Sequence, residues 1–239
     1  MKTLRFDSTT DWARGVADLW QERLDAKPDL RICLPSGNTP LPLFAEVVNR
    51  TESGRISLRE TEIFALDEYG GLPPDDPGRC VNMLRKHLID RAGLPPERFH
   101  FLDSTAPDLE SACSEYAAKI GARGFDLTLL GIGLNGHLGL NEPGSAPDST
   151  VRRVDMHRTS IASSANYLAH SRLPTWGLTV GLKELLASRE VWLVATGSSK
   201  ADILERVCHG PVTLNVPASL LRAHLNCLLL VDAAASAKI

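Results

Sequence analysis

The chain of 239 residues is 43% hydrophobic and 23% charged, with a formal net charge of −3 at pH 7, which is typical of a soluble globular protein. Neither sign of charge forms a long run, so we expect no nucleic-acid partner and no membrane surface. No apolar stretch reaches the ~20 residues of a membrane span. The length favours one α/β domain over residues 1–239.

The five cysteines are odd in number and scattered, without a C-x-x-C pair; they are Cys33, Cys80, Cys113, Cys208 and Cys227. This usage is typical of a reducing cytoplasm rather than of a disulfide framework. Residues 1–8 also lack the apolar core of a secretion signal. We therefore expect a cytoplasmic protein.

The first predicted element is a helix that begins near Ser8. Ser8 and Asp11 have the spacing of a capping box. Apolar residues then recur at helical spacing until Lys27 and Pro28 end the pattern. A short apolar strand is predicted next, over residues 30–34.

A loop of small residues, 35–40, connects this strand to a helix whose apolar face starts at Leu41. Free N–H groups and the positive end of a helix dipole make such a junction an anion site, to which Ser36 and Thr39 can add hydroxyl donors. The spacing is neither G-x-G-x-x-G nor a P-loop, so we infer neither a dinucleotide nor ATP. A plain strand-to-helix turn is the alternative.

Two acidic residues follow the next predicted strand, residues 62–66. Asp67 and Glu68 stand at its end, before a glycine- and proline-rich loop that reaches residue 77. A loop of this length is usually functional or mobile. At the carboxyl end of a buried strand the two residues can be a helix cap, a solvated pair or a site that includes a general base. Their position alone does not decide among these.

Segment 131–145 is the strongest active-site candidate. Helices predicted over 79–94 and 109–120, with a short strand at 100–102, precede an apolar strand at 125–130 that leads into it. Its glycines let the backbone approach a ligand or take positive φ. Between them stand Asn135, His137 and Glu142, which are groups that bind and move protons. The alternative is a tight turn with a solvated histidine and glutamate.

The last third of the chain continues the alternation of elements. We predict a strand at 151–161, a turn and a buried helix at 174–186, a strand at 191–195, one or two helical turns at 219–224, a strand at 226–231 and a frayed end at 233–239. A small-residue loop, 196–200, ends in Lys200 at a helix start. A lysine there opposes the helix dipole, which a bound anion would explain; a surface lysine is the alternative.

This alternation predicts a doubly wound, mostly parallel, Rossmann-like α/β sheet with helices on both faces. The strand ends at residues 34, 66, 130 and 195 would then meet along one edge. Anion-binding loops beside carboxylates and an imidazole indicate acid–base chemistry on a phosphorylated small molecule. Neither H-E-x-x-H nor G-x-S-x-G occurs, so we expect no metal site of that kind and no serine nucleophile.

Six segments in order resemble the glucosamine-6-phosphate deaminase/isomerase family, which belongs to a superfamily with the 6-phosphogluconolactonases. They are residues 34–40, 66–72, 131–144, 178–181, 196–201 and 218–224. The resemblance implies an amino-sugar phosphate deaminase that converts glucosamine 6-phosphate to fructose 6-phosphate and ammonia through an enolamine. It implies no cofactor.

The same resemblance implies a role for each matching residue. The substrate phosphate would be bound by Ser36, Gly37, Asn38, Thr39 and Lys200. His137 would open the pyranose ring, oriented by Asn135 and Glu142. Asp67 would carry the C2 proton of the open chain to C1.

The chain departs from the family pattern at two positions. Asn135 stands where many members have aspartate; its amide can orient His137 but cannot share a proton. Ala165 stands where members usually supply an arginine for the phosphate, and Arg172 is the nearby candidate to replace it.

Three other functions compete with deamination of glucosamine 6-phosphate. Galactosamine 6-phosphate is the epimeric substrate. A 6-phosphogluconolactonase is the alternative within the superfamily, but Tyr69 and the Asn-Glu-Pro-Gly segment at 141–144 weigh against it. A non-catalytic sugar-phosphate sensor would not need Asp67, His137 and Glu142 together. The sequence leaves open the epimer, allosteric regulation and the oligomeric state, with a homo-oligomer among the options.

Overall fold

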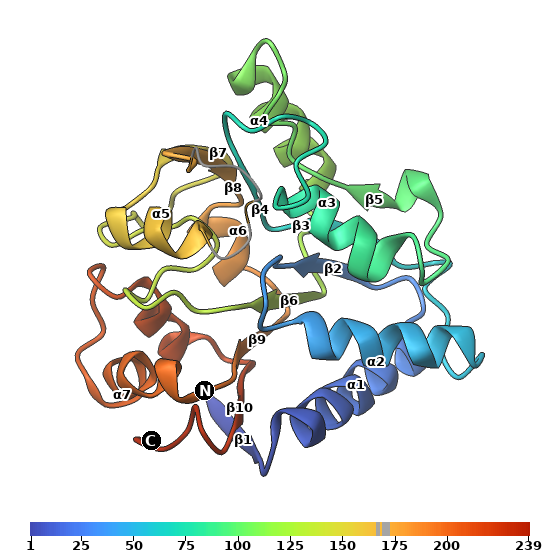
Figure 1. The fold of residues 1–239 in the computed structure, drawn as a ribbon, viewed down its shortest axis with the longest axis vertical. Helices are drawn as coiled ribbons and strands as arrows, with labels where there is room; N and C mark the ends of the chain where they lie inside the picture. Colours follow the sequence, from blue (N-terminus) through green and yellow to red (C-terminus); the bar gives the residue numbers. More distant parts are fainter. Residues whose placement is uncertain (166–167, 169–172) are drawn as a thin grey trace.

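The computed structural model describes residues 1–165, 168 and 173–239. Its main sheet has seven parallel strands in the order β1-β10-β9-β6-β2-β3-β5 (Figure 1). The strands are β1 Lys2–Phe6, β2 Arg31–Leu34, β3 Glu62–Ala65, β5 Phe99–His100, β6 Leu127–Leu130, β9 Glu190–Ala195 and β10 Cys227–Asp232. The predicted parallel sheet is therefore confirmed.

Helices cover both faces of this sheet, as a doubly wound fold requires. One face packs against α1 Thr9–Ala26, α2 Leu41–Glu52 and α3 Cys80–Leu84. The other packs against α4 Leu109–Ile120, α6 Leu182–Leu186 and α7 Ala201–His209. Short 3-10 turns complete the chain, at η2 Pro96–Arg98, η3 Ser198–Lys200 and η4 Pro217–Ala223.

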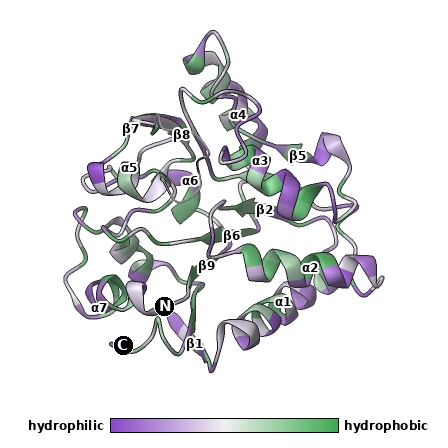
Figure 2. Cartoon of the chain, in the orientation of Figure 1, coloured by the Kyte–Doolittle hydropathy of each residue, from purple (hydrophilic) through white to green (hydrophobic). Residues whose placement is uncertain are grey.

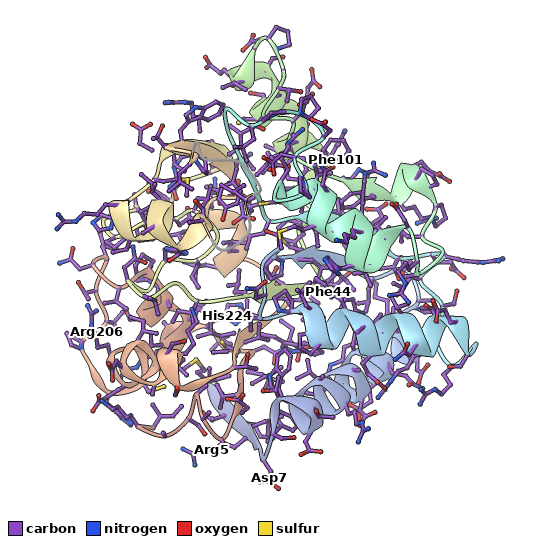
Figure 3. The ribbon with its side chains drawn as sticks, viewed as in Figure 1. Arg5, Asp7, Phe44, Phe101, Arg206 and His224 are labelled. Atoms are coloured by element: carbon purple, nitrogen blue, oxygen red, sulfur yellow. The ribbon has the colours of Figure 1, made fainter. Side chains whose placement is uncertain are left out.

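The hydropathy of the elements explains these layers. The central strands β2 and β6 are buried along their whole length and consist mainly of hydrophobic residues (Figure 2), as expected for a parallel sheet covered on both faces. Arg31 and Thr128 are their two buried polar residues. The helices are amphipathic: Phe44 of α2 is buried in the core, whereas Arg206 of α7 is exposed at the periphery (Figure 3). No helix within the described ranges has the length and apolar character of a membrane span.

A second, antiparallel sheet was not predicted. Its strands are β4 Asp67–Tyr69, β8 Trp176–Thr179 and β7 Arg152–Asp155, in the order β4-β8-β7. The strand predicted at 151–161 is thus β7 followed by the helix α5 Arg158–Ser164, and 174–186 contains β8 before α6. Gly177 allows the close pairing, because a Cβ there would lie 2.6 Å from the carbonyl oxygen of Glu68.

Three further features differ from the prediction: the end of one helix, a strand at the edge of the sheet and the C-terminal residues. The helix predicted over 79–94 is α3 continued by one π-helical turn, η1 Arg85–Ile89, and ends there. Strand β1 was missed because it is an edge strand with mostly exposed side chains and little apolar alternation. The C-terminal residues are anchored rather than frayed: Ala235 is fully buried, and its N–H donates to the Asp232 carboxylate at 2.8 Å.

Candidate active site

The loops that follow β2, β3, β6 and β9 line one cleft at the carboxyl edge of the sheet, where open α/β folds bind ligands. The predicted site residues that line it are Ser36, Gly37, Asn38, Thr39, Asp67, His137 and Lys200. Asn135 and Glu142 lie behind His137 and contact it. The structure therefore brings all nine predicted residues together.

The two acidic residues after β3 have different environments, because successive side chains of β4 point to opposite faces. Glu68 is 1% exposed and accepts hydrogen bonds from the N–H groups of Tyr69, Cys80 and Val81. Burial raises its pKa to about 7, against the opposing effects of Arg79 and these N–H groups. The Glu68 side chain thus caps the first N–H groups of α3 from the neighbouring strand β4, whereas Asp67 faces the cleft.

Asp67 has the electrostatics of a general base. Burial raises the pKa of its carboxyl to about 6, while His137 and a hydrogen bond from the Cys80 thiol oppose the rise. A carboxylate with this pKa is ionised at neutral pH yet accepts a proton more readily than an ordinary aspartate.

His137 lies against the carboxylate of Glu142, with 3.4 Å between Nδ1 and Oε2. Burial alone would raise the pKa of Glu142, but hydrogen bonds and charge from His137, Ser160 and Asn135 outweigh it and lower the pKa to about 2. Glu142 is therefore an anion and an acceptor only. The backbone N–H of His157 donates to its Oε1 at 3.1 Å.

Asn135 forms hydrogen bonds with both Glu142 and His137. Its side-chain amide donates to Glu142 Oε2 at 2.9 Å, and its Oδ1 accepts from the backbone N–H of His137 at 3.2 Å. A carboxylate at position 135 could not donate the first of these bonds. The amide is therefore compatible with an ionised Glu142. This hydrogen bond explains how the site accommodates asparagine at position 135, where many family members have aspartate.

Glycines of the loop make room for the imidazole. A Cβ at Gly133 would lie 2.3 Å from His137 Cε1, so only glycine allows the ring to pack on this backbone. Gly136 has a φ of 86°, in the left-handed region that favours glycine. Gly133 and Gly136 thus allow the loop to place the His137 ring in the cleft.

The predicted anion-binding loops also converge. The loop 35–40 precedes α2, which has no side-chain cap, and Lys200 is the N-cap of α7. Lys200 Nζ donates to the carbonyl of Ile132 at 2.7 Å, and burial lowers its pKa. Among the described residues that line the cleft, Lys200 is the single lysine or arginine.

The position expected to carry a phosphate-binding arginine has none. Ala165 follows the last residue of α5 and is exposed, and its methyl group cannot bind a phosphate. Arg172, the predicted substitute, lies outside the described residues. Within those residues, no group of three or more His, Cys, Asp or Glu side chains could hold a metal ion.

Side chains of the segment after β7 also line the cleft and were missed by sequence reasoning. They are Met156, Ser160 and Ser163. The segment was predicted to be a strand, so the face of α5 that carries Ser160 and Ser163 could not be read from it. The available signal was His157, whose ring nitrogen accepts from the N–H of Thr159 as an N-cap, a weak indication at the level of sequence.

The fold and the site together define an α/β enzyme whose cleft brings a carboxylate and an imidazole beside the predicted anion-binding loops. The chain belongs to the glucosamine-6-phosphate isomerase/6-phosphogluconolactonase family, whose family model matches residues 7–229.

Similar proteins cover nearly the whole chain. A glucosamine-6-phosphate deaminase of Rhodopirellula baltica is 38% identical over 92% of this chain and 89% of its own length. One of Bacillus pumilus is 32% identical over 97% of both chains. A solved monomeric glucosamine-6-phosphate deaminase superposes over 100% of both chains, with a TM-score of 0.96 and 28% identity. The 6-phosphogluconolactonase of Thermotoga maritima shares the fold, with a TM-score of 0.77, 21% identity and coverage of 97% and 99%.

Proposed function

We propose that this chain is a glucosamine-6-phosphate deaminase, which converts glucosamine 6-phosphate to fructose 6-phosphate and ammonia. The observation that carries the proposal is one cleft in which a carboxylate of near-neutral pKa, Asp67, lies with the His137–Glu142 pair and with the anion-binding loops. The deaminases named among its relatives support the same activity.

In this proposal the phosphate binds at one end of the cleft. Loop 36–39 would supply N–H and hydroxyl donors at the start of α2, and Lys200 would supply the positive charge. The ammonium group of Lys200 is already oriented by its bond to Ile132. The sugar would then extend towards Asp67 and His137.

The chemistry is a series of proton transfers. His137 takes the proton of the C1 hydroxyl, the C1–O5 bond breaks, and His137 returns the proton to O5, which opens the ring. Asp67 takes the C2 proton of the open-chain aldehyde while water supplies a proton to the aldehyde oxygen, which forms an enolamine. Return of the proton to C1 leaves an iminium at C2, and water adds there to release ammonia. This scheme uses no redox step and no cofactor.

The direct test is to supply purified protein with glucosamine 6-phosphate in the presence of a chelator. We expect ammonia and fructose 6-phosphate in equal amounts. Galactosamine 6-phosphate and 6-phosphogluconolactone would be assayed in parallel. Hydrolysis of the lactone without ammonia release from either amino sugar would contradict the proposal and favour the lactonase alternative.

We expect replacement of Lys200 by methionine to raise KM for glucosamine 6-phosphate by about tenfold to a hundredfold, because a charge-assisted hydrogen bond contributes ~1.5–3 kcal/mol. The fall in kcat should be smaller. Inhibition by inorganic phosphate should weaken in parallel. Lys86→Met is the matched control, since Lys86 is exposed on η1, outside the cleft. An unchanged inhibition constant for phosphate in Lys200→Met would remove Lys200 from the phosphate site.

We also propose that residues 1–239 act as one sugar-phosphate domain in the cytoplasm. The two hydrophobic clusters lie on opposite faces of the same seven-stranded sheet, which supports a single folding unit. All five cysteines are free thiols, and free thiols are typical of a reducing compartment.

A further inference from the structure

Ser160 is a buried hydroxyl in the cleft that the scheme above does not use. It lies on α5, is 4% exposed and lines the cleft. Its Oγ lies 3.0 Å from His137 Nδ1, closer than the 3.4 Å that separates this nitrogen from Glu142 Oε2. The serine is therefore the nearer of these two side-chain partners of Nδ1.

The charges around this nitrogen determine where the protons lie. Glu142 is an anion and can only accept, so a proton on Nδ1 is favoured over a lone pair facing the carboxylate. The Nδ1–H group then donates to Ser160 Oγ, and the serine hydroxyl donates its own proton to Glu142, with which it is hydrogen-bonded. Ser160 thus bridges the imidazole and the carboxylate.

The rest of the site holds this bridge in place. The backbone N–H of His157, which precedes α5, donates to Glu142 Oε1 at 3.1 Å, so the start of the helix is tied to the same carboxylate. On the other side, the ring of His137 packs against Gly133. Nδ1 is occupied, so Nε2 is the nitrogen that remains for the substrate.

We propose that Ser160 is a positioning residue that links the Nδ1–H group of His137 to Glu142 and so holds the ring with its unprotonated Nε2 towards the substrate. The catalytic consequence rests on the proposed deaminase reaction, in which Nε2 takes the C1 hydroxyl proton during ring opening. The tautomer itself is a property of the free protein and does not depend on the substrate.

The matched variants are Ser160→Ala and Ser164→Ala. Ser164 is a fully buried serine of the same helix whose hydroxyl donates to the carbonyl of Ile161. Both variants remove one buried oxygen from α5, but only the first removes a partner of His137. A general loss of stability would therefore affect both.

The primary measurements are the ¹⁵N chemical shifts of the His137 ring and the rate at which its Nδ1–H proton exchanges with water, in the full-length protein without ligand, at a pH where the ring is neutral. We expect the Nδ1–H tautomer in all three proteins, because Glu142 faces Nδ1 in each of them. The Nδ1–H proton should exchange with water about tenfold faster in Ser160→Ala than in wild type or Ser164→Ala, because the variant loses the nearer of its two partners. An Nε2–H ring in wild type, or an unchanged exchange rate in Ser160→Ala, would overturn the proposal.

The second measurement is steady-state kinetics with glucosamine 6-phosphate. We expect kcat of Ser160→Ala to fall about tenfold, the effect of one net hydrogen bond, with KM within about twofold of wild type. An equal fall in Ser164→Ala would assign the effect to packing and overturn the positioning role. If wild type releases no ammonia but the Nδ1–H proton exchanges faster in Ser160→Ala as expected, the role of Ser160 in holding the ring stands and the deaminase proposal fails.

Discussion

Replacing Asp67 by asparagine is expected to lower kcat for ammonia release by about 10²–10⁴, the usual contribution of a general base. The amide has the same shape but cannot take the C2 proton. The cleft otherwise keeps its anion-binding loops and Lys200, so KM should change by no more than a few-fold. Ammonia release and C2-hydrogen exchange with deuterated water should fall together, because both require the same proton transfer.

The pH dependence distinguishes loss of this base from a general disturbance of the site. Burial raises the pKa of Asp67 to about 6, and a base acts only when deprotonated. For wild type, kcat/KM should therefore fall about tenfold per pH unit below about 6, and this acid limb should be absent from the residual activity of Asp67→Asn. Asp75→Asn, an exposed residue of the following loop, is the control. A variant Asp67→Asn with a tenth or more of wild-type kcat would exclude Asp67 as the base.

The elements that converge on the cleft could largely be predicted from the sequence. Apolar runs that end in glycine or polar residues identified strands β2, β3, β6 and β9, and parallel order required their carboxyl ends to meet. The capping residue Ser8 likewise identified the start of α1. These features are local, so the spacing of residues along the chain is sufficient to detect them.

The remaining features depend on contacts between distant segments. Asp67 and Glu68 are equivalent in the sequence, and only the pairing of β4 with β8 turns one carboxylate to the cleft and the other under α3. Strand β8 was hidden because its four residues precede a helix with a stronger apolar pattern. Ser160 was missed because its contact with His137, which stands 23 residues earlier, depends on the position of α5 in the fold.

Replacing His137 by glutamine is expected to lower kcat with glucosamine 6-phosphate by about 10²–10³. The amide can accept or donate a hydrogen bond but cannot carry a proton from the C1 hydroxyl to O5. Turnover would then depend on the open-chain sugar that forms in solution without the enzyme.

Ring opening can be separated from binding with an acyclic ligand, the amino-alcohol phosphate obtained by reducing C1 of the substrate. This ligand has no ring to open, so His137→Gln should bind it within about threefold of the wild-type Kd, whereas Lys200→Met should bind it about tenfold or more weakly. A comparable loss of affinity in both variants would make His137 a binding residue, and the division of labour between the two ends of the cleft would be wrong. Retained affinity with lost turnover would place His137 at the step before Asp67 acts, since Asp67 can take the C2 proton only after C1 has become an aldehyde.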